Sequence, residues 1–448
     1  MALVGIGGGD HRRRRLVSIV EGAVSALAGK GIGVAVNLLA VPLAVGYLGP
    51  ERYGVWALVG SLLAWVRLAD LGIGNGLTNA IAGALGSERP DLVRAHVSTA
   101  LAVLCAISAL LAVAAALAWP WINWTALFGL KTELARAEVG PAMAAAVGLF
   151  LLGFPLSVIG RTFNAAGDGK LGNLWGMAGN VASLVALLLV TQTQGGLVWL
   201  VLAVSGTGLL VTALSGAWLF TYRRPAIAPR FGSVELGSAG TLMSVGAQFF
   251  LIQILALVVF ETDNLIVAHF LGAEQVPTYS LTYSLFNYAS IIQSVLFSYV
   301  WVAYSEAIAR RDIEWVRRTF RLNLAASLAF TGAAVLPLVF IAQPFVRLWS
   351  GGVVQPPTDL VLWMAVWGMI NAYCSPMACL LAAASHMRAQ IAYSALAAVA
   401  NIGLSVTLVQ RWGVTGVIAA TVISYLLFIC VPIAFDISFL LKKLRRAA

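Results

Sequence analysis

Charged residues are scarce in this chain of 448 residues: Asp, Glu, Lys and Arg make up 10% of it, whereas hydrophobic residues make up 60%. The mean hydropathy of +0.90 lies far above that of a soluble domain. Apolar runs of about 20 residues recur with short turns between them, and this is the length that an α-helix needs to cross a bilayer. The runs are continuous rather than alternating, which favours helices over a membrane β-barrel. The composition therefore predicts an all-α polytopic membrane protein.

Cysteine and histidine are also scarce, with four of each, and no two cysteines form a CxxC pair. All four cysteines fall in apolar runs, so they are expected to be small buried residues: Cys105, Cys374, Cys379 and Cys430. The four histidines are too dispersed to suggest a metal site. The sequence GDGK at Gly167–Lys170 is followed by Leu171, where a phosphate-binding loop needs Ser or Thr. No cofactor, metal or catalytic nucleophile is predicted.

The net charge of +10 comes mainly from Lys and Arg in the turns between apolar runs. Such a charge is also found in nucleic-acid-binding proteins, but basic residues in these turns indicate the orientation of membrane helices instead. Most of the 28 Lys and Arg residues lie on the cytoplasmic side if the amino terminus does. Both termini are thus predicted to be cytoplasmic. The four arginines of MALVGIGGGDHRRRR precede an apolar segment too long for a signal peptide, so it is expected to be a retained helix.

About twelve transmembrane helices are expected, six in each half of the chain. In the first half they lie near residues 20–48, 54–83, 97–119, 139–162, 174–193 and 196–220. In the second half they lie near residues 241–271, 276–304, 320–343, 359–384, 391–410 and 413–440. The expected organisation is an N-terminal lobe of residues 1–220, a polar cytoplasmic linker of residues 221–240 and a C-terminal lobe of residues 241–448.

The two halves resemble each other at an offset of roughly 220 residues. The turn YLGPERYG at Tyr47–Gly54 corresponds to FLGAEQVPTYS near Phe270, so that Gly49 pairs with Gly272. At nearly the same offset, Asp91 pairs with Asp312, and Asn180 with Asn401. Each copy has an even number of helices, so both enter the membrane in the same direction. Duplicated lobes of this kind are related by a pseudo-two-fold axis along the membrane normal, and their substrates bind between the halves.

Several segments carry a family resemblance: PLAVGYLGPERYGVWAL, LADLGIGNGL, ETDNLIVAHFLG and AEQVPTYSL. Together they resemble the Wzx-type oligosaccharide flippases, the polysaccharide transport branch of the MOP superfamily, which also includes MATE multidrug exporters. The resemblance implies a V-shaped two-lobe carrier in the bacterial cytoplasmic (inner) membrane. Its implied substrate is a polyprenyl-diphosphate-linked oligosaccharide, an O-antigen or exopolysaccharide repeat unit, moved from the inner to the outer leaflet. Membrane lipid and the polysaccharide polymerase machinery are the implied partners.

Basic residues within the spans are the first candidates for the substrate site, because charge inside the membrane is costly. Arg67 lies near the middle of the second expected helix, where it could hold a diphosphate or an acidic sugar. The alternative is a structural pair with Asp70, three residues further on. Lys30 lies near the cytoplasmic end of the first helix, where it either extends to the interface or faces the cavity. Asn37 is a further polar candidate on that helix.

Acidic residues occur in the seventh expected helix, where Glu261 and Asp263 lie close to the midplane. They are two residues apart and therefore point to different faces. One of them could take up H⁺ or Na⁺ and couple transport to a gradient; alternatively, Asp263 accepts hydrogen bonds from a neighbouring helix. On the eighth helix, Asn287 and Tyr288 are candidates to line a sugar path, with helix packing or an interfacial aromatic belt as the alternative.

Two other function classes fit the sequence less well than a flippase does. A MATE-type ion-coupled multidrug exporter needs acids in its cavity for cationic drugs, whereas the first helix offers Lys30 and Asn37 and no acid in mid-span. A membrane-embedded polymerase is expected to have a large outer loop. The longest outer connection, Pro120–Glu138, has only about 19 residues, so the chain is not predicted to be an enzyme.

Overall fold

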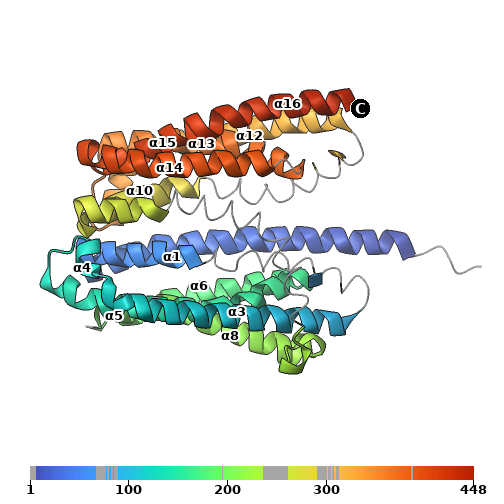
Figure 1. The fold of residues 1–448 in the computed structure, drawn as a ribbon, viewed down its shortest axis with the longest axis horizontal. Helices are drawn as coiled ribbons and strands as arrows, with labels where there is room; N and C mark the ends of the chain where they lie inside the picture. The colour runs from blue at the N-terminus through green and yellow to red at the C-terminus, as the bar shows by residue number, and fades with distance from the viewer. Residues whose placement is uncertain are drawn as a thin grey trace, which may run out of the picture.

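The computed structural model describes residues 7–66, 77, 80, 81, 84, 89–193, 195–235, 261–289, 300, 304, 307, 308, 312–384 and 387–447. Within these residues, nine helices are long and apolar enough to cross a membrane. The helices of each half of the chain pack into a lobe, and the two lobes lie next to each other (Figure 1). The predicted all-α polytopic fold of two six-helix lobes is confirmed.

The N-terminal lobe begins with α1 (Gly7–Val66), which merges the first two expected helices across a kink at Gly49. It continues with α3 (Pro90–Ala118), η1 (Trp119–Trp121), α4 (Trp124–Leu127), α5 (Glu133–Ala165) and α6 (Gly169–Thr191). Its last membrane crossing has four consecutive parts: α7 (Gly196–Val201), the π-helix η2 (Leu202–Gly206), α8 (Thr207–Trp218) and a second π-helix, η3 (Leu219–Arg223).

The C-terminal lobe begins, within the described residues, with the helix of residues 261–271. It continues with η6 (Ala273–Gln275), α10 (Val276–Tyr288), α12 (Ile313–Trp349), α13 (Thr358–Ala383) and α14 (Met387–Trp412). Its last crossing is α15 (Val414–Tyr425), the π-helix η7 (Leu426–Cys430) and α16 (Val431–Ala447). The start of α1 and the end of α16 lie at the same end of the molecule, and α4 and the start of α10 lie at the opposite end (Figure 1).

Two helices begin earlier than hydropathy indicated because polar residues cap them outside the apolar run. The Thr132 side chain accepts a hydrogen bond from the Ala135 amide at the start of α5, and Asp312 accepts one from the Trp315 amide at the start of α12. A capping side chain satisfies an amide that has no partner within the helix. The expected ranges, which began at residues 139 and 320, covered the apolar spans rather than the whole helices.

Matched positions in the two lobes share unusual backbone conformations. Three pairs of glycines at turns have positive φ in both copies: Gly49 and Gly272, Gly129 and Gly352, and Gly196 and Gly413. Positive φ is costly for residues with a Cβ, which is why glycine occupies these turns. A π-helix also occurs in the last crossing of each lobe, although η2 begins closer to its turn glycine Gly196 than η7 does to Gly413. The repeat seen in the sequence therefore extends to local backbone geometry.

Prolines inside the helices leave backbone carbonyls that serine side chains satisfy. Pro155 in α5 has no N–H, so the Leu151 carbonyl lacks its helical donor, and Ser108 of α3 donates to it at 2.7 Å. In the other lobe, Pro376 in α13 leaves the Ala372 carbonyl free, and Ser327 of α12 donates to it, also at 2.7 Å. Each lobe thus has the same kind of link between two neighbouring helices, buried in the C-terminal lobe and partly buried in the N-terminal one.

Large apolar side chains cover much of the outside of the bundle. Leu110, Leu117 and Phe340 expose 69%, 71% and 77% of their surface. An exposed apolar surface of this extent is unfavourable in water and expected in lipid. The chain is a multi-pass membrane protein.

The connection between the lobes is fixed along the N-terminal lobe as far as residue 235. Asp168, buried at the start of α6, accepts hydrogen bonds from Arg223 Nη2 at 2.9 Å and from Arg224 Nε at 3.0 Å. Further along, the Thr99 hydroxyl of α3 accepts a hydrogen bond from the Glu235 amide at 2.9 Å. The remainder of the predicted linker, residues 236–240, lies outside the described residues. The residue limits predicted for the lobes stay a prediction.

Candidate substrate cavity and buried acidic cluster

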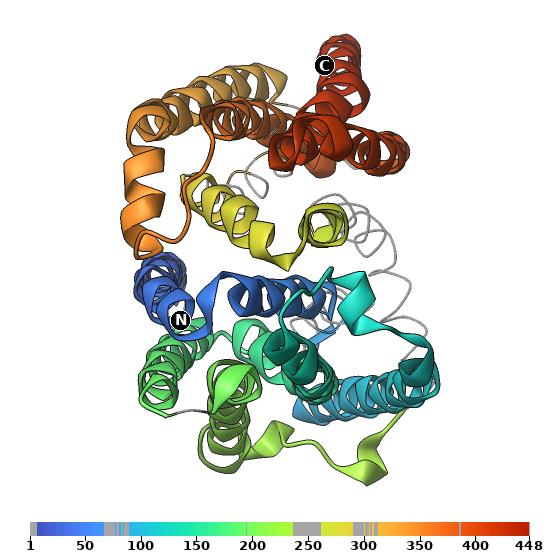
Figure 2. The ribbon, with the colours of Figure 1, turned by 90° about the vertical axis from the view of Figure 1, so that its left-hand side faces the viewer.

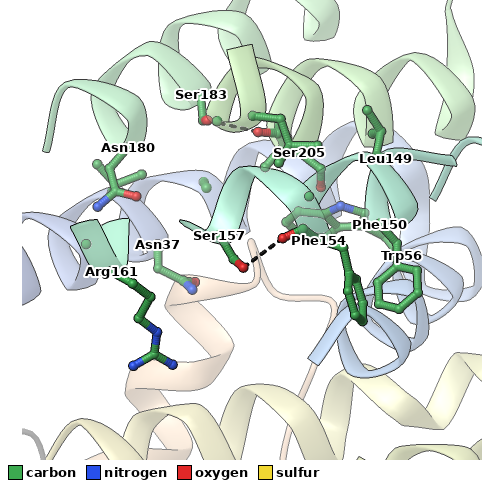
Figure 3. A pocket seen from close by; sticks show the side chains of 17 residues that line it. Asn37, Trp56, Leu149, Phe150, Phe154, Ser157, Arg161, Asn180, Ser183 and Ser205 are labelled. Carbon is green, nitrogen blue, oxygen red and sulfur yellow. Dashed lines mark hydrogen bonds between the residues drawn. The ribbon is translucent and has the colours of Figure 1, made fainter. Parts of the chain in front are cut away.

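The N-terminal lobe contains a cavity of about 720 Å³ between α1, α5, α6, η2 and α8. Its polar lining consists of Asn37, Ser157, Arg161, Asn180, Ser183 and Ser205. Figure 3 shows Arg161 and Asn180 towards one end, the three serines in the middle, and Trp56, Phe150 and Phe154 towards the other end. The cavity is therefore graded from a cationic and amide end to an aromatic end.

Small residues and a π-helix create the space. Gly33 of α1 faces the side-chain amide of Asn180 in α6, since a Cβ on Gly33 would lie 3.5 Å from Asn180 Nδ2. The wider turn of η2 disrupts the regular ladder of backbone hydrogen bonds, and Ser183 donates to the Val204 carbonyl at 2.9 Å. Ser205, in the same π-helix, lines the cavity. Irregular helix geometry of this kind often marks functional positions.

Arg161 is the charged side chain among the described residues that line the cavity, and no carboxylate occurs among them. It lies in the last turns of α5 and is half-buried. A guanidinium presents a planar set of donors that matches phosphate or carboxylate groups in a bidentate manner. Amides and hydroxyls can exchange hydrogen bonds with sugar hydroxyls, and aromatic faces can stack on sugar rings. The chemistry of the cavity suits an anionic, hydroxyl-rich ligand.

The predicted substrate residues are distributed unevenly around this cavity. Asn37 lines it, whereas Lys30 is exposed on α1 one turn before the lining residue Gly33. Arg67 and Asp70 lie outside the described residues. Asn287 and Tyr288 end α10 in the other lobe and are not among the lining residues of this cavity. Asn287 is exposed, and the buried Tyr288 hydroxyl has no hydrogen-bond partner among the described residues.

Several lining residues were missed by the sequence analysis. Arg161 was counted as one of the basic residues that orient the chain, because it lies near the end of an apolar run. Trp56 and the serines carry no distinctive pattern in a chain with 14 Trp residues. Asn180 had a signal, since its match with Asn401 picked it out as a polar residue shared by the two lobes.

The C-terminal lobe contains a buried acidic cluster around Asp263, whose exposure is 1%. The Tyr279 hydroxyl donates a short hydrogen bond to Asp263 Oδ2, and the Thr421 hydroxyl lies 3.4 Å from the same oxygen. Asn401 Nδ2 in turn donates to Thr421 Oγ1 at 2.9 Å. Asp263 Oδ1 and Asn401 Oδ1 are buried and have no hydrogen-bond partner among the described residues. Of these two acceptor oxygens, which lack donors among the described residues, the Asp263 carboxylate can take up a proton, and either can ligate a small cation.

Glu261, the other predicted coupling residue, is half-buried and interacts electrostatically with Asp263. The hydrogen bonds that Asp263 accepts come from α10 and α15, so the carboxylate is enclosed by helices of its own lobe. It is not among the described lining residues of the N-terminal cavity.

The fold and the graded cavity define a two-lobe α-helical membrane carrier, and solved structures with this fold confirm the architecture. The chain superposes on an inward-facing MATE multidrug resistance transporter of the MOP superfamily with a TM-score of 0.81 and 14% identity, over 95% of this chain and 99% of that one. An outward-facing MATE transporter of the same superfamily gives a TM-score of 0.69 with 15% identity, covering 96% of each chain. At these identities the likeness shows the fold.

Sequence relatives are more specific. Residues 19–305 match the model of the polysaccharide biosynthesis protein family, and the chain belongs to this family. It is 23% identical, over 92% of its length and 95% of the relative's, to a Salmonella typhi protein described as an O-antigen transporter. A Yersinia pseudotuberculosis protein described as an O-antigen export protein is 21% identical over 64% of this chain and 65% of that one. The resemblance to the Wzx-type branch of the MOP superfamily is thereby confirmed.

Proposed function

We propose that the protein is a flippase that moves a polyprenyl-diphosphate-linked oligosaccharide from the inner to the outer leaflet of the bacterial inner membrane. The observation that carries this proposal is the N-terminal cavity, in which Arg161 is joined by amides, hydroxyls and aromatic rings and by no described carboxylate. The similarity to a relative described as an O-antigen transporter over nearly the whole chain supports the same substrate class. A cavity for cationic drugs would be expected to contain acids, so its composition favours the flippase over the exporter.

In this proposal, Arg161 holds the diphosphate or an acidic sugar, and Asn37 and Asn180 orient the sugar hydroxyls. Lys30, exposed on α1 one turn before the lining residue Gly33, adds positive potential that attracts the anionic head group. The polyprenyl chain stays in the bilayer, against the apolar outer surface of the helices. Arg67, Asp70, Asn287 and Tyr288 remain predicted substrate residues.

The described lining of the cavity lies within the N-terminal lobe rather than between the halves, where the duplication led us to expect it. The mechanism that we propose is alternating access, in which rocking of the two lobes opens this cavity first to one side of the membrane and then to the other. The superposition is better with the inward-facing carrier than with the outward-facing one. This supports a state open towards the end that holds both termini, which we assign to the cytoplasm from the distribution of Lys and Arg. Any contact with a polysaccharide polymerase stays a prediction.

A test of the substrate starts from a strain that lacks this gene and carries either the wild type, Arg161→Gln or Arg161→Lys. Arg411→Gln, at an exposed position in the last turn of α14, is the matched control. Lipid-linked oligosaccharide is extracted and its inner-leaflet share is measured, and susceptibility to cationic drugs is scored in parallel. Loss of a charge-assisted contact is expected to lower flipping roughly 10- to 100-fold in Arg161→Gln, with partial recovery in Arg161→Lys.

The control variant should clear the lipid as well as the wild type does. Unchanged lipid levels in the deletion strain, together with higher drug sensitivity, would reject the flippase in favour of the exporter. Accumulation that Arg161→Gln clears fully would keep the flippase but reject Arg161 as its head-group ligand.

We further propose that Asp263 couples this transport to a gradient by binding and releasing H⁺ or Na⁺. The motivating observation is its buried carboxylate, one oxygen of which lacks a hydrogen-bond partner among the described residues. In proteoliposomes, Asp263→Asn is expected to keep downhill flipping and to lose acceleration by an imposed pH or Na⁺ gradient. Asp359→Asn, at an exposed position in the first turn of α13, serves as the control. Full acceleration in Asp263→Asn would exclude this carboxylate as the coupling group.

A further inference from the structure

The two lobes meet in direct backbone contact at the end opposite the termini. A Cβ on Gly54 of α1 would lie 1.9 Å from the carbonyl oxygen of Ala273 in η6. A Cβ on Gly129 would lie 2.9 Å from the Ala268 oxygen and 3.3 Å from Gly272 Cα. Only glycine lets the backbones approach so closely. Because Gly54 and Gly129 have no side chains, the two lobes can lie in contact at this end.

Charged groups bridge the lobes around this contact. The Glu51 carboxylate accepts hydrogen bonds from the backbone amides of Lys131 and Thr132 within the N-terminal lobe. The Lys131 side chain then forms an ion pair with Glu274 of the C-terminal lobe. Lys131 is exposed and Glu274 is partly exposed, so the pair contributes little by itself. The strength of the closure must be sought in less exposed groups.

A hydrogen bond between the lobes, partly buried and donated by a buried side chain, meets this requirement. Pro42 in α1 has no N–H, so the Leu38 carbonyl four residues earlier has no donor within its own helix. Trp349, the last residue of α12, donates its indole Nε1–H to this carbonyl at 2.7 Å. The indole is buried, with 6% of the residue exposed. Figure 2 looks onto this end of the molecule, where the orange end of α12 reaches the blue α1.

Three carbonyls lack a helical donor because a proline follows four residues later, and they differ in which lobe supplies their side-chain donor: those of Leu38, Leu151 and Ala372. Ser108 and Ser327, which serve the carbonyls freed by Pro155 and Pro376, each belong to the same lobe as the proline. The carbonyl freed by Pro42 takes its donor from the other lobe. When the lobes separate at this end, the Leu38 carbonyl and the Trp349 indole both lose this partner, and a polar group left without a hydrogen bond is costly.

We propose that the hydrogen bond from Trp349 to the Leu38 carbonyl is the latch that holds the carrier closed at the end opposite its termini. The latch rests on the alternating-access mechanism proposed above, and it is independent of which substrate is carried. It assigns Trp349 and Pro42 a conformational role, since neither is among the described lining residues of the cavity.

The latch is tested by the rate at which a thiol buried at the closure becomes accessible. Ala273, which is 1% exposed, is replaced by cysteine in a full-length chain whose four native cysteines are changed to alanine. The protein is placed in lipid nanodiscs without substrate and labelled with a water-soluble maleimide, whose rate follows the fraction of time that this end is open. Trp349→Phe removes the donor and keeps an aromatic ring, and Pro42→Ala returns an N–H to the Leu38 carbonyl.

Both variants are expected to raise the labelling rate roughly 2- to 12-fold, as loss of one net hydrogen bond would. Trp349→Phe removes the bond, and Pro42→Ala gives the Leu38 carbonyl a partner that it keeps when the lobes separate. Because both variants act through the same carbonyl, their combination should label no faster than the faster single variant. Pro155→Ala and Pro376→Ala are the matched controls, and they should leave the rate unchanged.

An unchanged rate in Trp349→Phe overturns the latch, and so does an equal rise in all four single variants, which would show general loosening of the helices. The assay contains no lipid-linked sugar, so its failure would leave the flippase proposal standing. Conversely, a substrate of another class would leave the labelling result intact.

Discussion

Replacing Gly54 by alanine is expected to hold the end opposite the termini open. The added Cβ would lie 1.9 Å from the Ala273 carbonyl oxygen, whereas carbon and oxygen atoms in favourable contact are about 3.3 Å apart. The clash involves backbone on the far side, so no side-chain rotation relieves it, and the lobes must separate by roughly 1.4 Å at this point. Overpacking of this kind costs about 1–3 kcal/mol in the closed state.

The control is Gly60→Ala in the same half of α1, since a Cβ at Gly60 meets nothing within 4 Å. In a helix, alanine is more favourable than glycine by about 1 kcal/mol, so Gly60→Ala should stabilise the protein. The stability of the two variants is therefore expected to differ by about 1–3 kcal/mol.

Opening can be followed by electron paramagnetic resonance between spin labels at Glu133 and Asp359, both exposed at this end in different lobes. The label separation is expected to increase in Gly54→Ala and to stay at the wild-type value in Gly60→Ala. Thermal unfolding in detergent supplies the second measurement. An unchanged distance in Gly54→Ala, together with a raised midpoint like that of Gly60→Ala, would refute the close contact between the lobes.

Two further predictions concern charged groups outside the membrane. The hydrogen bond to Glu274, together with the charge of that residue, raises the pKa of Lys131 above its ordinary value of 10.5. The pair therefore makes its small contribution at neutral pH and is lost as the pH rises through the raised pKa. The separation between spin labels at Glu133 and Asp359 should increase slightly in strong base, and Glu274→Gln should remove that dependence. Asp168→Asn removes the charge that binds two arginines of the linker, and it is expected to lower the free energy of unfolding by about 1–3 kcal/mol. Thermal unfolding measures this loss. The control is Asp91→Asn, at an exposed carboxylate in the first turn of α3, and an equal loss there would contradict a specific role for Asp168.

The class of fold was predictable because hydrophobic run length reports directly on membrane crossing. The turns were also predictable where glycine and a second copy occurred together, as at Gly49 and Gly272. Helix ends were less so, since Thr132 and Asp312 extend α5 and α12 through caps that lie outside the apolar runs. The π-helix at Leu202–Gly206 has no pattern in the sequence, although it shapes one wall of the cavity.

The candidate site was harder to predict. A sequence shows how deep a residue lies in the membrane better than it shows which way its side chain points from the helix. Arg161 lies near the end of an apolar run, where orientation by the positive-inside rule explains a basic residue sufficiently. Its position on the cavity wall depends on the packing of α5 against α1 and α6. Asp263 was predicted as a coupling residue from its depth alone. Its enclosure by Tyr279 and Thr421 depends on two consecutive helices packing against α15, which lies far along the chain.

The duplicated lobes differ in which of their contacts are repeated: contacts within a lobe occur in both copies, whereas the latch between the lobes occurs once. In the register that aligns Gly49 with Gly272, Pro42 corresponds to Leu265 and Trp349 to Ala126, so neither partner of the latch is repeated. The links from serine to a proline-freed carbonyl do occur in both copies, because each lobe has to hold its own helices together through the transport cycle. The hydrogen bond from Trp349 to Leu38 must break once in each transport cycle, so it need not be repeated in both lobes. One such bond is enough to hold the two lobes together until they separate. A repeated motif therefore indicates the rigid units of this carrier, whereas its unmatched buried polar contacts indicate where the units part.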